Sequence, residues 1–222
     1  VEGGSSVRLR RKPWVDEAIH AYDDFVYPKD RPAGEAERGR WKEIFGREAP
    51  LFVELGTGKG DFIRQMAERS PEVNFIGIEK QQDVLIAAAK KVREKELKNV
   101  RLLVFDIAQL EKIFASGEVD RFFVNFCDPW PKARHAKRRL THRSFLARYK
   151  ELLVPGGKLV FKTDNRALFD FSLEEFREMG LSLHDVSYDL HSEARPDNVM
   201  TEYEKKFSGK GEKINRCEVT FA

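Results

Sequence analysis

The sequence predicts an α/β fold: a Rossmann-like, mostly parallel, seven-stranded sheet with helices on both faces and a last antiparallel strand. Two observations lead to it. From residue 51 onward, short continuous apolar runs alternate with amphipathic stretches, which is typical of parallel strands covered on both faces. Two late strand-like runs are left without a clear crossover pattern, so we expect them to end the sheet as an antiparallel pair.

Each element is placed from its own apolar pattern. The runs expected to form the parallel strands are Leu51–Leu55, Val73–Ile78, Val100–Phe105, Arg121–Phe126 and Lys158–Lys162. The late strands are expected at Leu181–Leu190 and Ile214–Phe221. Apolar residues at helical spacing predict helices over Gln82–Leu97, Phe62–Arg69, Arg143–Leu153 and Leu168–Met179.

The N-terminal part of the chain has a different character. Residues 1–6 (VEGGSS) look like an expression remnant or a disordered end. A basic arm, Val7–Lys12, leads to a short helix expected around Asp16–Phe25, and Pro28–Arg40 mixes proline, glycine and charge as loops do. We therefore separate residues 1–6, an arm, helix and loop over residues 7–45, and the main domain over residues 46–222.

Composition excludes several classes of protein. The 222 residues are 41% hydrophobic and include 17 Phe, which suits one compact domain and argues against a disordered chain. The longest apolar run, Val84–Ala89, is far shorter than the roughly 20 residues that span a bilayer. Only Cys127 and Cys217 are present, too few for a disulfide framework and without metal-ligand spacing. We expect a cytoplasmic protein without a metal or a membrane segment.

An acidic residue stands at the end of each of the five expected parallel strands: Glu54, Glu79, Asp106, Asp128 and Asp164. Each one alone could be a turn residue or a helix cap. Ligands of open α/β sheets bind beyond the carboxyl ends of the strands, which meet at one edge. Five acids at that edge therefore predict a binding site.

A glycine-rich loop follows the first strand. Gly56, Gly58 and Gly60 let a ligand approach the backbone closely, because glycine has no Cβ and tolerates positive φ. The dinucleotide-binding fingerprint has a glycine where Asp61 stands, and this carboxylate would repel a pyrophosphate at the helix start. The loop therefore disfavours NAD.

The strand-end acids suit S-adenosylmethionine instead. This ligand has no phosphate, and it presents an ammonium, a ribose diol and an adenine amine to acidic acceptors. We assign Glu79 to the ribose hydroxyls, Asp106 to the adenine edge, and Glu54 with the loop to the methionine end.

A one-sided basic segment follows the fourth strand. Residues 131–150 contain eight Lys/Arg and no Asp/Glu, in a chain whose formal net charge is only +3. A charge run is often just a solvated face, but this one starts at the expected ligand-binding edge. Together with the basic arm it predicts a surface for a polyanion larger than a mononucleotide.

Four motifs resemble one family: ELGTGKG (54–60), D-P-W-P-K-x-R-H-x-K-R-R (128–139), LVPGGKLVFKTD (153–164) and TEYEKKF (201–207). The chain resembles the bacterial tRNA (guanine-N7)-methyltransferases, which are class I methyltransferases, from about Arg8 onward. The resemblance implies that residues 46–222 form a domain that transfers a methyl group from S-adenosylmethionine to a guanosine of the tRNA variable loop. The products would be 7-methylguanosine and S-adenosylhomocysteine.

The resemblance also implies roles for individual residues. The cofactor-binding set would be Glu54, Gly56, Gly58, Gly60, Glu79, Asp106 and Asp128, and Asp128 would also be catalytic. The substrate-binding set would be Lys132, Asp164, Thr201, Glu202, Tyr203 and Glu204. The RNA-binding set would be Arg134, His135, Lys137, Arg138 and Arg139. The partner would be tRNA, and the protein would be a monomer or a homodimer.

Chemistry indicates what Asp128 would do. Guanine N7 carries an in-plane lone pair and no proton, so its methylation needs positioning rather than a general base. Positive charge moves from sulfur to the base, and a fixed carboxylate would stabilise it. Asp128 would play this role or accept hydrogen bonds from guanine N1–H and N2–H2. Trp130 could stack on the base or pack beneath the loop, whereas Cys127 is expected to be a small buried residue.

Two rival functions remain open. A methyltransferase for an exocyclic amine uses a similar turn, D/N-P-P-[YFW], but Trp130 stands here at the second position after the acid, where that turn has proline. A noncatalytic RNA-binding protein on the same fold would be favoured by the loss of a strand-end acid, and all five are present.

Overall fold

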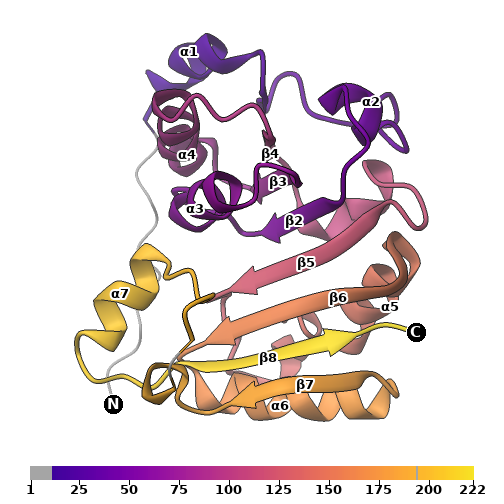
Figure 1. Cartoon of the computed structure of the whole chain (residues 1–222), viewed down its shortest axis with the longest axis vertical. Helices are drawn as coiled ribbons and strands as arrows, with labels where there is room; N and C mark the ends of the chain where they lie inside the picture. The colour runs from indigo at the N-terminus through magenta and orange to yellow at the C-terminus, as the bar shows by residue number, and fades with distance from the viewer. Residues whose placement is uncertain (1–11, 194) are drawn as a thin grey trace.

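The computed structural model describes residues 12–193 and 195–222. Over these residues the chain forms one eight-stranded sheet with helices on both faces (Figure 1). The strands are β1 (Val26–Tyr27), β2 (Leu51–Leu55), β3 (Asn74–Glu79), β4 (Val100–Val104), β5 (Val119–Asn125), β6 (Leu153–Thr163), β7 (Ser182–Ser187) and β8 (Asn215–Thr220). Their order across the sheet is β1-β4-β3-β2-β5-β6-β8-β7.

The mostly parallel sheet and its late antiparallel strand are confirmed. Every pair from β1 to β6 is parallel, and β8 runs antiparallel to both of its neighbours, β6 and β7. All seven predicted strands are present. β6 starts earlier than expected, because Leu153 pairs with Val119 before a register irregularity.

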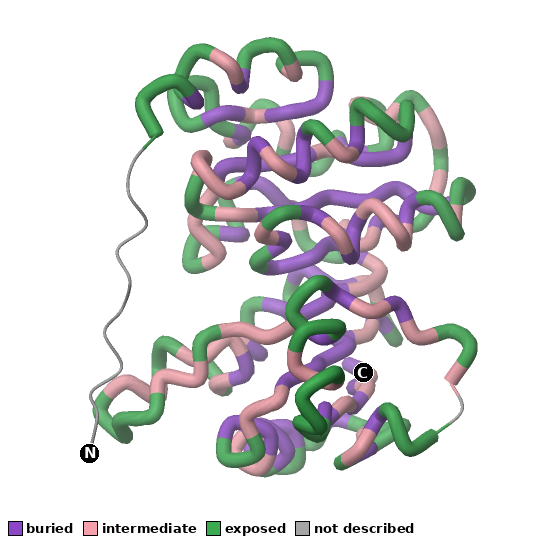
Figure 2. Tube along the Cα trace, turned by 90° about the vertical axis from the view of Figure 1, so that its left-hand side faces the viewer, coloured by how far each residue is buried: buried purple, intermediate pink, exposed green. Residues whose placement is uncertain are grey.

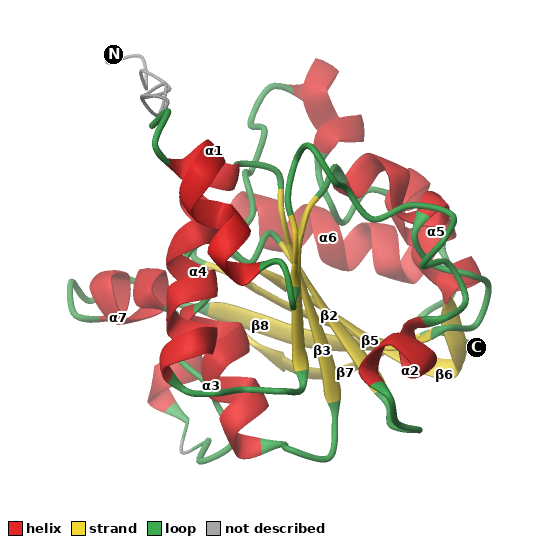
Figure 3. Ribbon diagram, turned by 90° about the horizontal axis from the view of Figure 1, so that it is seen from above, coloured by secondary structure: helices red, strands yellow, loops and turns green. Residues whose placement is uncertain are grey.

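The helices form two layers. They are α1 (Val15–Ala18), α2 (Trp41–Phe45), α3 (Asp61–Arg69), α4 (Gln82–Glu94), α5 (Arg143–Leu152), α6 (Arg166–Glu178) and α7 (Glu202–Ser208), with 3-10 turns η1 (Ile19–Tyr22), η2 (Ile107–Lys112), η3 (Ala133–Arg138) and η4 (Leu190–Ser192). Figure 3 shows α3 and α4 on one side of the sheet and α5 and α6 on the other. Among the helices of the described chain, none has the length and apolar character that crossing a membrane requires.

The eighth strand, β1, was not predicted. Val26 pairs in parallel with Leu102, and Tyr27 with Leu103. Two residues are too few to show a strand period, so the strand depends on its neighbours. Before it, the short helix expected near residues 16–25 appears as α1 and η1, whose Val15 and Ile19 are buried in a cluster with residues of α4. The basic arm over residues 7–11 and the segment 1–6 lie outside the described residues.

The core lies on both faces of the sheet. Buried residues follow the strands and the inward sides of the helices in Figure 2. One cluster joins the sheet to α5 and α6, and a second joins it to α1, α3 and α4. Trp41 is fully buried, and its Nε1 donates to the carbonyl of Ile113 at 2.8 Å.

The strand order creates a natural ligand-binding crevice. The chain builds β2, β3 and β4 toward one side, then returns to place β5 on the other side of β2. Ligands of open α/β sheets bind at such a reversal, beyond the carboxyl ends of the strands. The glycine-rich loop begins there, directly after β2.

Candidate active site

The structure places three strand-end acids around one cavity. Glu79, Asp106 and Asp128 line a space of about 620 Å³ at the carboxyl edge, together with Gly56 and Trp130. Asp106 caps η2 by accepting from the Ala108 N–H at 3.0 Å. Its other oxygen lies 2.7 Å from Lys80 Nζ, and the hydrogen bonds from Lys80 and Ala108 lower the Asp106 pKa. The cavity is therefore lined by anionic acceptors.

The glycine loop bends tightly beside this cavity. Gly56 and Gly58 have φ of +83° and +55°, and a Cβ at either position would meet nothing within 4 Å. The Gly58 N–H donates to Glu79 Oε2 at 3.2 Å. Since a side chain at these two positions would project into open space, their glycines keep the backbone accessible to a ligand.

Gly60 has a different reason to be glycine. Its φ is +76°, and a Cβ there would lie 2.4 Å from the Cβ of Ala88. The residue therefore permits close packing of α3 against α4. It also lines a smaller cavity of about 190 Å³, along with Glu54, Asp61, Thr201 and other residues of the loop and α7.

Glu54 is buried beneath the loop. Its oxygens accept hydrogen bonds from the Thr57 hydroxyl at 2.5 Å and from Asn125 Nδ2 at 3.2 Å. Burial raises the pKa of Glu54 to about 7, although both hydrogen bonds act in the opposite direction. The carboxyl group can thus gain or lose a proton near neutral pH.

Asn125 supplies a test of the expected ligand. Its Oδ1 is buried and has no hydrogen-bond partner within the described chain. The residue lines both cavities just described. An unpaired buried acceptor costs free energy that a donor group restores. Together with Glu54, Glu79 and Asp106, it makes an acceptor set that fits a ligand carrying an ammonium and hydroxyl groups, as S-adenosylmethionine does.

Asp128 lies in a strained turn. Phe126 and Trp130, on either side of it, have φ of +55° and +43°, values that non-glycine residues rarely adopt and that gather at functional sites. Asp128 is exposed and has no hydrogen bond or ion pair within the described residues. Arg139 supports the turn, because its guanidinium donates to the carbonyls of Pro129 and Trp130 at 3.0 to 3.3 Å.

The basic segment borders the same cavity. Lys137 and Arg138 line it, and the Arg138 guanidinium lies 4.9 Å from the Trp130 ring. The His135 ring meets the Trp130 ring edge-on at 5.8 Å. Lys132 and Arg134 are exposed beside it. Trp130 is therefore a wall of the cavity rather than a core residue.

Tyr203 and Asp164 meet at the edge of the site. The Tyr203 hydroxyl donates to Asp164 Oδ2 at 3.3 Å. Its ring packs between Phe126 and Phe207, at centroid distances of 4.8 and 4.1 Å. Sequence reasoning would have placed Tyr203 on a solvated helix start, and only the family resemblance singled it out.

The cap of α7 holds two further expected site residues. Thr201 and Glu204 form a reciprocal capping box, and both are buried. Glu202 is exposed, and its Oε1 lies 2.6 Å from Lys91 of α4. Of these three, Thr201 and Glu202 line the smaller cavity, whereas Glu204 does not. Glu204 thus acts as a support of α7 in this structure.

The sequence reasoning missed Lys162. This residue of β6 is buried, with Nζ at 2.6 Å from Glu204 Oε2 and 2.8 Å from the Val199 carbonyl. Burial lowers its pKa, although Glu204 opposes the shift. A lysine inside the apolar run LVFKT was the signal that could have identified it.

Cys127 is not suited to act as a nucleophile. Burial raises the pKa of its thiol to about 12. The group therefore stays protonated at neutral pH and lacks the thiolate that a nucleophile needs. Cys127 was expected to be buried, but it is only partly buried and contributes to the lining of the larger cavity.

Similarity to known proteins extends over nearly the whole chain. Residues 48–217 match a family model described as "Putative methyltransferase". The chain is 51% identical to a tRNA (guanine-N(7)-)-methyltransferase of Geobacillus sp. (strain WCH70), over 97% of this chain and 96% of the relative. It is 47% identical to the protein of that name from Bacillus subtilis (strain 168), over 96% of this chain and 98% of that relative.

Solved structures agree on the fold. One described as an antibiotic related methyltransferase matches with a TM-score of 0.60 and 20% identity, covering 81% of this chain and 91% of that chain. The 16S rRNA methyltransferase KamB matches with a TM-score of 0.59 and 13% identity, covering 82% of this chain and 91% of that chain. At these identities the likeness shows the class I methyltransferase fold alone. The full-length relatives go further, and the chain belongs to the tRNA (guanine-N7)-methyltransferase family.

Proposed function

We propose that the protein transfers the methyl group of S-adenosylmethionine to N7 of a guanosine in the tRNA variable loop, and so forms 7-methylguanosine. The observation that carries this proposal is the cavity at the carboxyl edge of the sheet. Three acids, Glu79, Asp106 and Asp128, line it together with two cations of the basic segment, Lys137 and Arg138. A cationic methyl donor and an anionic RNA can therefore meet at one place.

The donor would lie along the glycine loop. Asp106 would contact the adenine edge and Glu79 the ribose hydroxyls, while Glu54 and Asn125 would receive the methionine end. The backbone at Gly56 and Gly58 leaves open space for it, and Gly60 fixes the loop through the contact of α3 with α4. When bound, S-adenosylmethionine supplies a methyl group on a positively charged sulfur.

The acceptor guanine would lie beside Asp128. N7 needs no base, so the work of the protein is to hold the ring in line and to stabilise the positive charge that the base acquires. Asp128 is free of other partners in the described chain and is available for this. Trp130 offers a stacking face, and Asp164 with Tyr203 would orient the base from the other side.

The RNA backbone would follow the basic segment. Lys132, Arg134, His135, Lys137 and Arg138 are candidates for phosphate or sugar contacts, because none of them has a carboxylate partner within the described residues. Arg139 would contribute mainly by supporting the turn. Thr201, Glu202 and Glu204 would hold α7 and Tyr203 at the acceptor side. We propose that the protein does this in the cytoplasm, as a monomer or a homodimer.

The experiment that tests this function is methyl transfer from a labelled donor to an unmodified tRNA transcript, followed by nucleoside analysis. We expect label in 7-methylguanosine, and its loss when the variable-loop guanosine is replaced. Label in another nucleoside would support methylation of an exocyclic amine. Absence of label with measurable donor and tRNA binding would support a noncatalytic RNA-binding protein.

A further inference from the structure

A third cavity lies beside α3, over the part of the sheet formed by β5, β6 and β8. It measures about 430 Å³, and Figure 1 shows β5, β6 and β8 open toward the viewer there. Its apolar floor is a small cluster of Phe62, Phe123, Val160 and Val199. The strand residues beside the floor are charged, which is unusual for a sheet face that a helix would cover.

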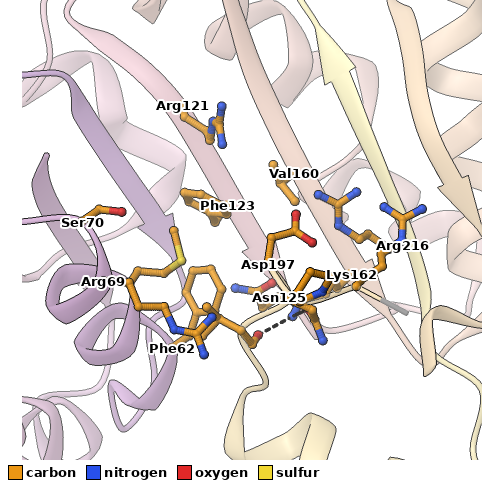
Figure 4. Close-up of a pocket in the computed structure, with 15 residues that line it drawn as sticks. Phe62, Arg69, Ser70, Arg121, Phe123, Asn125, Val160, Lys162, Asp197 and Arg216 are labelled. Atoms are coloured by element: carbon orange, nitrogen blue, oxygen red, sulfur yellow. Dashed lines mark hydrogen bonds between the residues drawn. The ribbon is translucent and has the colours of Figure 1, made fainter. Parts of the chain in front are cut away.

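Cations surround this cavity. Arg121 of β5, Lys162 of β6 and Arg216 of β8 come from the sheet, Arg69 from the end of α3 and Arg195 from the loop before α7; Asp197 is the one acid among the lining residues. Figure 4 shows Arg69, Arg121 and Arg216 on three sides of the space, with Asp197 between them. We call this space the arginine cavity.

Two of these cations form no close ion pair, although Arg121 attracts the Glu218 carboxylate at longer range and helps to lower its pKa. Lys162 is paired with Glu204, and Arg195 with Glu193 at 2.8 Å. Within the described residues, Arg69 and Arg121 have no carboxylate within 4 Å, and the Arg121 guanidinium lies 4.8 Å from the Phe52 ring. Two unpaired guanidinium groups beside an apolar floor favour an anionic ligand with a flat apolar part.

Arg216 gives an independent sign of a missing ligand. Its side chain is 12% exposed, and its Nη1 is buried without a hydrogen bond in the described chain. The other guanidinium nitrogen, Nη2, lies 3.5 Å from Glu218 Oε2, whereas Nη1 has only Asp185 Oδ2 at 3.6 Å, which is too far for a hydrogen bond. A buried guanidinium nitrogen without an acceptor is costly, and a phosphate oxygen is an acceptor that would satisfy it.

The arginine cavity shares lining residues with the proposed active site. Asn125 lines it and also both cavities at the carboxyl edge, and Phe62 lines it and the smaller of those two. A nucleic acid whose target base enters at that edge would therefore bring neighbouring nucleotides to the arginines. A cationic chain segment would be repelled by the same groups.

We propose that the arginine cavity is a second RNA-binding site, which holds the phosphodiester backbone of nucleotides that flank the target base. Arg69 and Arg121 bind phosphate oxygens, and Phe123 contacts the flat face of a base. RNA would then be held from two sides, by this cavity and by the basic segment after β5. The identification of the RNA as tRNA rests on the proposed function. The expectation of a polyanionic ligand rests on the residues of the cavity.

The test is tRNA binding by the full chain carrying R69E and R121E, measured over a series of salt concentrations. Each lost phosphate contact lowers the slope of log affinity against log salt by about one, so we expect a slope lower by about two and an affinity loss on the order of tenfold or more near 0.1 M salt. The milder variant R69Q/R121Q should also lower the tRNA affinity and the salt slope, but by less. Unchanged binding of S-adenosylmethionine would show that the variants are folded.

Arg177 provides a matched control. It is exposed in the last turn of α6, as Arg69 is in the last turn of α3, and it too has no carboxylate partner in the described chain. R177E should leave the affinity and the salt slope at their wild-type values. An equal affinity loss per substitution in R177E and in the R69E/R121E variant would mean that only net charge matters, and this would overturn the proposal.

Two further outcomes would contradict RNA binding at the arginine cavity. Wild-type tRNA affinity in the R69E/R121E variant would overturn the proposal, as would a changed oligomeric state with unchanged affinity, since the cavity would then be a contact between copies. The fate of the proposed function is read separately, from methyl transfer by the wild-type chain. If the wild-type protein binds tRNA through these arginines but transfers no methyl group, the RNA-binding site is supported and the proposed function is wrong.

Discussion

Lys162 Nζ lies 2.6 Å from Glu204 Oε2, and the two side chains are 3% and 0% exposed. This ion pair joins the carboxyl end of β6 to the first turn of α7. Glu204 also closes the capping box with Thr201, and Tyr203, between them, reaches Asp164. The acceptor side of the proposed site is therefore held in place by a buried pair that the substrate need not touch.

Lys162→Met is expected to destabilise the protein strongly. It leaves the buried Glu204 carboxylate with two side-chain partners in the described chain, His191 Nε2 at 3.2 Å and the Asn198 amide at 2.9 Å, both on its other oxygen. Breaking a buried pair in this way costs about 3–5 kcal/mol. Lys158 on the same strand is the matched control, because its Nζ also lies 2.6 Å from a carboxylate, Glu218, but its side chain is 38% exposed. Lys158→Met should cost at most about 1 kcal/mol. Urea denaturation measures the free energy of unfolding of both variants. Equal losses of stability would show that burial of the Lys162–Glu204 pair does not matter.

Glu54 should make stability depend on pH. The folded protein raises its pKa from 4.5 to about 7, so between these values the folded state binds the proton more tightly than the unfolded chain. The stabilisation from this proton is therefore present at low pH and falls as the pH rises through 7.

Glu54→Gln removes this dependence. Compared with wild type, the variant should gain about 3 kcal/mol in the free energy of unfolding between pH 5 and pH 8. Denaturation curves of the two proteins at several pH values measure the difference. A difference that stays constant with pH would show that Glu54 does not titrate in this range.

Gly60→Ala tests the contact between α3 and α4. The added Cβ would lie 2.4 Å from the Ala88 Cβ, and such overpacking costs about 1–3 kcal/mol. Gly46→Ala is the control, since its φ of +70° is similar but nothing lies within 4 Å. We expect Gly60→Ala to lower the melting temperature more, and Ala88→Gly to restore part of the loss. If both substitutions lower the melting temperature equally, backbone strain at positive φ explains the loss and the contact with Ala88 does not.

Asp128→Asn should reduce turnover and leave the fold intact. Asp128 is exposed and unpaired in the described chain, so the melting temperature should not change. Loss of a charge aimed at the transition state costs on the order of 100-fold to 1000-fold in kcat, whereas the Kd for S-adenosylmethionine should stay within about threefold of wild type. Single-turnover kinetics and donor titration separate the two. Parallel losses in kcat and donor affinity would assign Asp128 to donor binding instead.

The sheet could be predicted because its signal is local. Leu51–Leu55 and Val100–Val104 are apolar except for Glu54 and Arg101. Such mostly apolar runs indicate strands that are covered on both faces. The two residues of β1 carry no such period, and they form a strand only because β4 offers them an edge. The position of the strand-end acids followed from the topology of parallel strands, which needs no side-chain detail.

The supports of the site could not be predicted in the same way. Lys162 meets Glu204 across 42 positions of sequence, so its burial depends on where α7 returns to the sheet. The apolar run around Lys162 indicates that the residue is buried, but nothing near it in the sequence indicates which acid it meets. The arginine cavity is similar, because Arg69, Arg121 and Arg216 are distant in sequence and meet only after the sheet is complete.

If the protein methylates N7 of a guanosine, replacing that one atom in the tRNA should abolish the reaction. A tRNA that carries 7-deazaguanosine at the variable-loop target keeps the Watson–Crick edge and the exocyclic amine but has a carbon in place of N7. With labelled S-adenosylmethionine, we expect full labelling of the unmodified tRNA and no labelling of the 7-deazaguanosine form, at equal tRNA affinity. Undiminished labelling of the 7-deazaguanosine tRNA would contradict methylation of N7 and would move the reaction to another atom.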